Sequence, residues 1–154
     1  MVEIKKDFRN IIREFKAVAL DTQVFIYHFQ ENPVYLPLTR MIFETIEHEE
    51  TLASTSVMTL MELLVKPMRE GNVKAVEEYK FALETFPNLT LRSVDAAVSE
   101  KAAEIRAAYN LRSPDAIQLA SAINSNAEAF FTNDARLKRI QDIRIILLKE
   151  YRDT

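Results

Sequence analysis

The chain has 154 residues, with 20 Lys and Arg against 23 Asp and Glu, one Gly and no Cys. A chain of this length can bury about 68–70% of its unfolded surface, so we expect one packed domain without disulfides. The composition excludes thiol nucleophiles, zinc–thiolate sites and glycine-rich phosphate loops, and the net charge of −3 argues against binding nucleic acid mainly by bulk positive potential.

Helical and strand patterns alternate along the chain. The apolar spacing and the turn signals predict, in chain order, helix 2–15, strand 17–20, helix 22–29, helix 38–49, strand 51–53, helix 57–65, helix 72–85, strand 89–91, a helix from about 95 to 108, helix 114–124, strand 129–131, helix 134–140 and strand 143–148. No apolar run reaches the length of about 18 residues that a membrane span needs, and we expect a cytoplasmic protein.

Several boundaries are marked by specific residues. Residues 54–56, Ser-Thr-Ser, are good capping residues for helix 57–65, and Pro67 is expected to end that helix. Ser113 is expected to cap the next-to-last helix, with Pro114 at its first position and Asp115 in its first turn.

This order predicts an α/β fold, a three-layer α/β/α sandwich with a mostly parallel central sheet. Residues 2–15 carry apolar side chains at helical spacing, so we treat 1–16 as an amphipathic helix packed on a main domain of residues 17–154. In such sheets ligands bind beyond the carboxyl ends of the strands, which is where chemistry is expected.

Four acidic residues are placed to meet at that edge. Asp21 directly follows the first strand, Asp134 lies just beyond the fourth, Asp115 opens a helix, and Glu62 lies one turn inside the helix after the second strand. Carboxylates packed together repel unless a cation holds them, and oxygen ligands favour Mg²⁺ or Mn²⁺. The sequence therefore predicts a divalent metal site.

Each acid also has a simpler interpretation. Asp115 can act only as a helix-start acid, Asp134 as a turn or capping residue, and Glu62 as an exposed helical residue. Asp21 is the hardest to explain away, because an acid directly after a buried strand has no obvious structural duty. The two histidines are isolated and form no ligand pair.

The stretches around these acids resemble the four motifs of PIN-domain ribonucleases. They are Leu20–Ile26, Met61–Leu63, Arg112–Ala122 and Phe131–Leu137. The resemblance covers roughly residues 17–148, and small prokaryotic PIN proteins of this kind are similar to VapC toxins of toxin–antitoxin pairs. The chain departs from the family at Gln23, where Asn is usual, and in the added helix 2–15.

The resemblance implies a metal-dependent endoribonuclease, the toxin of a type II toxin–antitoxin pair. Asp21, Glu62, Asp115 and Asp134 would be both the catalytic and the metal-binding residues, with Mg²⁺ or Mn²⁺ as cofactor. It also implies an RNA substrate, a small antitoxin partner and a homodimer. The alternative is a catalytically inactive binding module on a PIN scaffold. A haloacid-dehalogenase-like phosphatase is disfavoured because it needs a second Asp at position 23.

Further side chains are candidates for supporting roles. Thr22, Thr132 and Asn133 either orient a carboxylate or a metal-bound water, or stabilise turns. The basic residues that could position RNA, or simply be solvated, are Lys66, Arg112, Arg136, Lys138 and Arg139. The apolar residues that could line a groove for a partner helix, or belong to the core, are Val24, Phe25, Tyr27, Phe29 and Tyr35.

Overall fold

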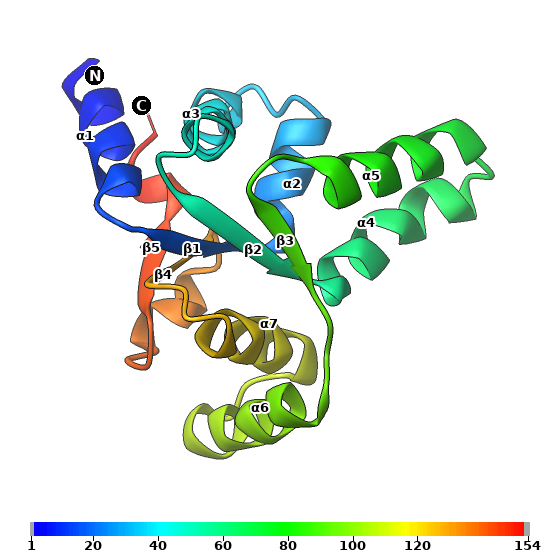
Figure 1. Cartoon of the computed structure of the whole chain (residues 1–154), viewed down its shortest axis with the longest axis vertical. Coiled ribbons are helices and arrows are strands. Elements are labelled where there is room, and N and C mark those ends of the chain that lie inside the picture. The colour runs from blue at the N-terminus through cyan, green and yellow to red at the C-terminus, as the bar shows by residue number, and fades with distance from the viewer. Residues whose placement is uncertain (1, 153–154) are drawn as a thin grey trace.

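The computed structural model describes the backbone of residues 2–152 and the side chains of residues 8–152. Its centre is a five-stranded sheet in which all neighbouring strands are parallel, in the order β3-β2-β1-β4-β5 (Figure 1). The strands are β1 (Ala17–Leu20), β2 (Leu52–Ser56), β3 (Leu89–Arg92), β4 (Ala129–Thr132) and β5 (Arg144–Leu147). The expectation of a mostly parallel central sheet is confirmed.

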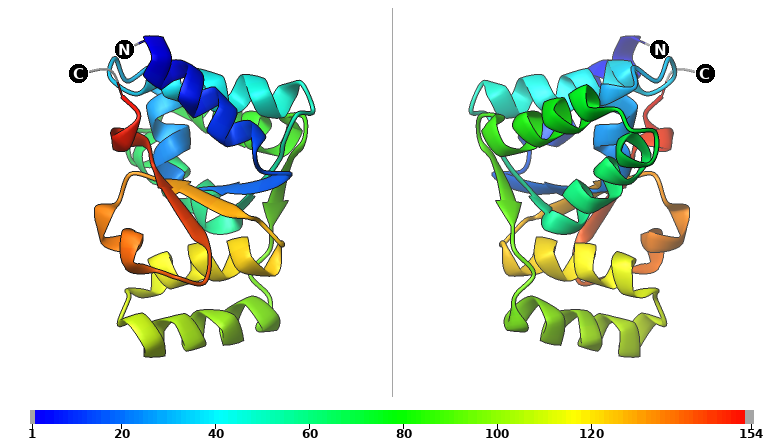
Figure 2. Two further views of the ribbon diagram at one scale, coloured as in Figure 1. Left: turned by 90° about the vertical axis from the view of Figure 1, so that its left-hand side faces the viewer. Right: turned by 90° about the vertical axis from the view of Figure 1, so that its right-hand side faces the viewer.

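Helices cover both faces of this sheet and complete the predicted α/β/α sandwich. They are α1 (Val2–Arg13), α2 (Thr22–Phe29), α3 (Leu36–Glu47), α4 (Val57–Arg69), α5 (Val73–Thr85), α6 (Ala96–Tyr109) and α7 (Ser113–Asn124), with short 3-10 helices η1 (Ala135–Arg139) and η2 (Leu148–Glu150). Helices α1 to α5 lie on one face, and α6 and α7 lie on the other (Figure 2). Within residues 2–152, no helix is long and apolar enough to cross a membrane.

The strands supply side chains to two separate cores, because successive residues of a strand point to opposite faces. Leu20 and Phe131 belong to the core under α1 to α5, whereas Ala19 and Phe130 belong to the core under α6 and α7. This double burial explains why the sequence of β1 and β4 is apolar at consecutive positions.

Helix α1 is part of the first core. The side chains of Phe8 and Ile12 are fully buried, and the ring of Phe8 packs against Phe131, with ring centroids 6.1 Å apart. The hydroxyl of Thr51 donates to the carbonyl oxygens of Ile12 and Phe15, which ties the end of α1 to the start of β2. The separation of residues 1–16 from a domain of residues 17–154 stays a prediction.

Helix α4 continues through Pro67, so the prediction that this proline ends the helix is wrong. Proline gives up one backbone hydrogen bond inside a helix. Here its side chain is buried together with Leu63 and Leu64, and the helix ends only at Arg69. The packing of α4 along its neighbour α5 outweighs the local cost.

The polar residues before α4 are divided between the strand and the cap. Ser54 and Thr55 were expected to be caps, but both belong to β2 and are buried. The hydroxyl of Thr55 donates to the carbonyl of Leu20 at 2.8 Å, which satisfies this polar group inside the sheet. Only Ser56 caps α4, by accepting from the N–H of Met58 at 3.1 Å.

Two helix starts also differ from the prediction. Helix α3 begins at Leu36 instead of residue 38, with Pro37 in its first turn, where a missing N–H costs nothing. Helix α7 begins at Ser113, which is helical and not a cap; its hydroxyl accepts a hydrogen bond from Arg106 at 3.1 Å.

Candidate metal centre

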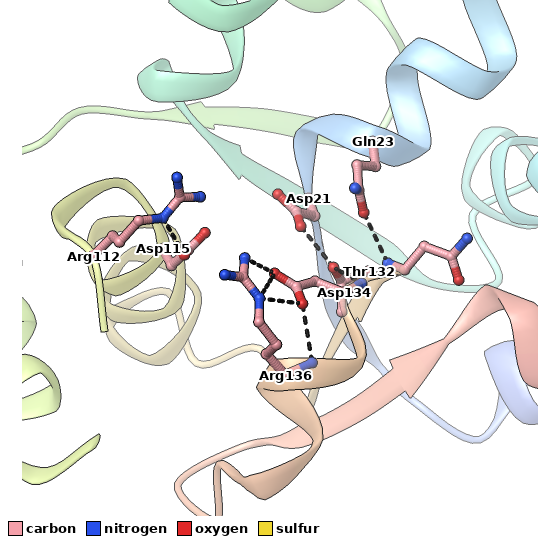
Figure 3. A network of polar contacts seen from close by, with 8 residues as sticks. Asp21, Gln23, Arg112, Asp115, Thr132, Asp134 and Arg136 are labelled. Atoms are coloured by element: carbon pink, nitrogen blue, oxygen red, sulfur yellow. Dashed lines mark hydrogen bonds and ion pairs between the residues drawn. The ribbon is translucent and has the colours of Figure 1, made fainter. Parts of the chain in front are cut away.

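The carboxyl edge of the sheet collects the four predicted acids, which we call the acidic site: Asp21, Glu62, Asp115 and Asp134. Asp21 follows β1, Asp134 follows β4, and Glu62 lies in α4 after β2. Helix α7 leads into the amino end of β4, so its own first turn, with Asp115, lies at the same edge. Figure 3 shows Asp21, Asp115 and Asp134 converging from three elements, with Arg112 and Arg136 beside them.

Asp21 is held by two hydrogen bonds. Its Oδ1 accepts from the N–H of Thr22 at 2.8 Å, and its Oδ2 accepts from the hydroxyl of Thr132 at 2.7 Å. The pKa of Asp21 is raised from its ordinary 3.8 to about 6, mainly by burial and to a smaller extent by the charges of Glu62 and Asp115, against the effect of these hydrogen bonds.

Asp21 thus has a structural duty that the sequence analysis did not foresee, because its side chain caps α2. The capping role does not explain why Asp21 is half-buried beside other negative charges. An exposed aspartate caps a helix equally well, whereas a carboxylate with its pKa raised by burial and by like charges is typical of a functional site.

Glu62 is held by a polar network of which the sequence analysis named only Thr22. The hydroxyl of Thr22 donates to Glu62 Oε1 at 2.8 Å. The buried amide of Gln118 donates from Nε2 to the hydroxyl oxygens of Thr22 and Thr59, at 3.2 and 3.0 Å, and lies 3.5 Å from Glu62 Oε1. The hydroxyl of Thr59 also contacts that of Thr55 at 2.8 Å.

A sequence signal for this network exists. Gln118 lies three residues after Asp115 in α7, and Thr59 lies three residues before Glu62 in α4. Residues three apart share a helix face, so a polar residue three positions from a candidate acid, in an otherwise apolar stretch, is a candidate partner of the site.

Asp134 and Asp115 are each paired with an arginine. Arg136 donates from Nη2 to Asp134 Oδ2 at 2.7 Å and from Nε to Asp134 Oδ1 at 3.0 Å, and its backbone N–H donates to the same Oδ1 at 3.0 Å. These hydrogen bonds hold the pKa of Asp134 below its ordinary value. Arg112 Nε lies 3.5 Å from Asp115 Oδ2.

The acidic site offers carboxylate oxygens as metal ligands, and these ligands are the ones that a hard divalent cation prefers. The spacing is not yet that of a closed metal site: among the side chains of residues 8–152, no three His, Asp or Glu are grouped closely enough to hold an ion. The arginines on Asp115 and Asp134 occupy carboxylates that a cation would use.

A family model for the PIN domain matches residues 18–143, which include all four acids. The chain belongs to the PIN-domain family. No curated protein sequence matches the chain significantly.

Solved structures share this PIN fold over most of the chain. A toxin–antitoxin complex from Klebsiella pneumoniae is 20% identical with a TM-score of 0.64, covering 85% of this chain and 97% of its own. DNA-bound VapBC from Salmonella typhimurium is 22% identical with a TM-score of 0.63, and FitAcB from Neisseria gonorrhoeae is 18% identical with a TM-score of 0.62; each covers 86% of this chain and 98% of its own. At these identities the likeness shows the fold.

Gln23, where the family usually has Asn, links helix α2 to the loop after β4 of this PIN domain. Its Oε1 accepts from the backbone N–H of Asn133 at 3.1 Å. The amide of Asn133 donates to the hydroxyl of Tyr27 at 3.1 Å, and its Oδ1 accepts from the N–H of Lys149 at 2.9 Å. These contacts fix the loop that carries Asp134, and neither amide bonds to an acid of the site.

The other basic candidates are engaged elsewhere. Lys138 pairs with Glu150 at 3.0 Å, and Arg139 donates to the carbonyl of Tyr109 at 2.6 Å. Lys66 instead lines a groove of about 260 Å³ between α2, α4 and α5, next to Glu62. Of the five, Arg112, Arg136 and Lys66 are therefore the ones near the acids.

The apolar residues predicted to line a groove for a partner helix do not lie together in one groove. Phe25 and Val24 are buried in the core, and Tyr27 stacks on Tyr35 with ring centroids 4.5 Å apart. Of the aromatic set, only Phe29 lines the open groove beside Glu62. Its other lining residues are Ile26, Gln30, Leu63, Lys66, Pro67, Glu70, Asn72, Ala75 and Tyr79.

Proposed function

We propose that this PIN domain is a metal-dependent endoribonuclease that hydrolyses RNA phosphodiester bonds. The observation that carries the proposal is the half-buried carboxylate of Asp21 at the edge of the sheet, in the company of Glu62 and Asp115, with its pKa raised to about 6. Keeping such a charge in the folded state is costly unless a cation joins it. A loss of folding stability at Asp21 is expected if this charge is needed for a reaction.

Asp21, Glu62, Asp115 and Asp134 would hold Mg²⁺ or Mn²⁺. Such an ion, when bound, lowers the pKa of a coordinated water to near neutrality and neutralises charge on the scissile phosphate. The chain's own residues orient the ligands. Thr132 and the N–H of Thr22 fix the two oxygens of Asp21, and the hydroxyl of Thr22 fixes Glu62.

In the reaction, water adds to the phosphorus and the ester bond to the leaving oxygen breaks. No histidine is required, and the two histidines are not among the residues that form the acidic site. Arg112 and Lys66, at the rim of the acids, are suited to contact RNA phosphates.

We also propose that the protein is the toxin of a type II toxin–antitoxin pair, acting in the cytoplasm as a homodimer. The fold match to toxin–antitoxin complexes supports this assignment. The groove of Ile26, Phe29, Lys66 and Tyr79 beside Glu62 is the surface we assign to the antitoxin. A partner side chain of positive charge reaching from the groove would compete with metal for the acids.

The nuclease proposal is tested with purified protein and single-stranded or loop-containing RNA. We expect cleavage in Mg²⁺ or Mn²⁺, none in excess EDTA, and loss of cleavage in Asp21→Asn. Undiminished cleavage in chelator would refute the metal mechanism. RNA binding without turnover, unchanged in Asp21→Asn, would favour the alternative of an inactive PIN-scaffold binding module.

The toxin assignment needs its own test. Induction of the gene alone should arrest growth, and co-expression of the adjacent small gene should relieve the arrest. We further expect inhibition by that partner to weaken as the metal concentration rises. Equal toxicity with and without the adjacent gene would contradict the assignment.

A further inference from the structure

The contact between Arg136 and Asp134 occupies both oxygens of the carboxylate. Nη2 of Arg136 lies 2.7 Å from Oδ2, and Nε lies 3.0 Å from Oδ1 and 3.2 Å from Oδ2. This two-pronged arrangement is the strongest that a guanidinium makes with a carboxylate. Any cation that binds Asp134 must therefore compete with Arg136.

The surroundings show that Arg136 faces more than one acid. The charge of Asp115 also stabilises the guanidinium of Arg136, and the charge of Arg112 also acts on Asp134. Figure 3 shows the guanidinium of Arg136 on the side of Asp134 that faces Asp115. Two arginines and two aspartates thus balance one another where the acids converge.

We propose that Arg136 is the internal counter-ion of the acidic site, which a divalent ion must displace in order to bind. The proposal rests on the proposed function, because it takes the four acids as the metal ligands. The proposal explains why the four acids lie at one edge of the sheet but are not spaced as metal ligands. The charge of Asp134 is already neutralised by Arg136.

The geometry allows this displacement. The side chain of Arg136 is 66% exposed, whereas that of Asp134 is 17% exposed, so the arginine can swing into solvent while the aspartate stays in place. The backbone N–H of Arg136 still donates to Asp134 Oδ1 after the side chain leaves. The released guanidinium remains at the site, where a phosphate of bound RNA offers it two oxygens as a bidentate partner.

A matched control lies in the same short helix. Arg139 carries the same charge on η1, but its side chain donates to the carbonyl of Tyr109. Replacing either arginine by glutamine changes the net charge equally. Of these two variants, only Arg136→Gln removes a guanidinium that contacts an acid of the site.

The experiment measures the Mn²⁺ dissociation constant by calorimetry, and the melting temperature with and without Mn²⁺. In Arg136→Gln we expect Mn²⁺ to bind about 3- to 10-fold more tightly, as expected for removal of one charge-assisted competitor. We also expect a lower melting temperature without metal and a larger increase on adding it. Arg139→Gln should keep the wild-type affinity for Mn²⁺. Arg136→Lys keeps the charge but loses the two-pronged contact with Asp134, so its affinity for Mn²⁺ should lie between those of the wild type and Arg136→Gln.

Unchanged or weaker Mn²⁺ binding in a folded Arg136→Gln would overturn the proposal, as would absence of binding in both the variant and the wild type. Binding in Arg136→Gln alone would support it strongly. The nuclease proposal is judged separately by RNA cleavage. Tighter Mn²⁺ binding by Arg136→Gln, without RNA cleavage by the wild type, would support the counter-ion proposal and refute the nuclease proposal. RNA cleavage by the wild type, with unaltered Mn²⁺ affinity in Arg136→Gln, would support the nuclease proposal and refute the counter-ion proposal.

Discussion

Thr22 contacts two acids of the site at once. Its backbone N–H donates to Asp21 Oδ1 and its hydroxyl donates to Glu62 Oε1, both at 2.8 Å. The first contact follows from the turn that starts α2, and the second depends on α4 packing beside it. One residue therefore fixes the relative orientation of carboxylates that are 41 positions apart in the sequence.

The first prediction concerns this hydroxyl. Thr22→Val should lower kcat/KM and Mn²⁺ affinity by about 10-fold, because one hydrogen bond to a charged group contributes about 1.5 kcal/mol. Thr22→Ser, which keeps the hydroxyl, should retain most of both. Thr45→Val removes a buried hydroxyl that donates to the carbonyl of Met41, away from the acids, and should leave Mn²⁺ affinity unchanged. Equal effects of both valine variants would show that Thr22 acts only through stability.

The second prediction concerns Gln118. Gln118→Met keeps the approximate volume but removes the donor to Thr22 and Thr59, so we expect a loss of about 1–3 kcal/mol in the free energy of unfolding, measured in urea. Gln141→Met, at an exposed position, should change it by no more than about 0.5 kcal/mol. A neutral Gln118→Met would mean that the network does not depend on this amide.

The third prediction is a pH dependence of stability in the metal-free protein. The folded-state pKa of Asp21, about 6, lies above its ordinary 3.8, so the folded state binds more protons between these values. The free energy of unfolding should therefore fall as the pH rises from about 4 to about 6, by about 1–3 kcal/mol from this group. The lowered pKa of Asp134 acts in the opposite sense and at more acidic pH, where protonation removes its ion pair.

Asp21→Asn should remove this decline and be more stable than the wild type at pH 7 without metal, as followed by urea unfolding at several pH values. Asp142→Asn, which alters an exposed aspartate outside the acidic site, is the control and should keep the wild-type profile. A large loss of stability in Asp21→Asn would show that capping α2 is the main role of this side chain.

The fourth prediction concerns helix α1. Phe8 is fully buried against Phe131 and Tyr151, so Phe8→Ala should cost about 3–5 kcal/mol of stability. Phe81→Ala, at a side chain that is 69% exposed, should cost about 0.5 kcal/mol or less. Thermal unfolding of both variants decides whether α1 is an integral part of the core. A small effect of Phe8→Ala would show that the helix contributes little to the stability of the core.

The sequence by itself determined the fold of this protein and the position of its acids along the chain. Burial on both faces of the sheet makes β1 and β4 apolar at consecutive positions, and this pattern is readable without coordinates. Once the strands are parallel, Asp21 and Asp134 must lie at one edge, because Asp21 directly follows β1 and Asp134 is the second residue after β4. The same reasoning failed at Pro67, where burial against neighbouring helices, and not local propensity, decided the outcome.

Only the tertiary structure decided what each acid contacts. Thr22 with Glu62 and Gln118 with Thr59 are pairs from different helices, and their distances depend on how α2, α4 and α7 pack. The pairing of Arg136 with Asp134 is local, but its consequence for the site depends on Asp115 arriving from α7. Local sequence sets which backbone groups are capped, whereas charge balance between carboxylates and arginines is a property of three-dimensional proximity.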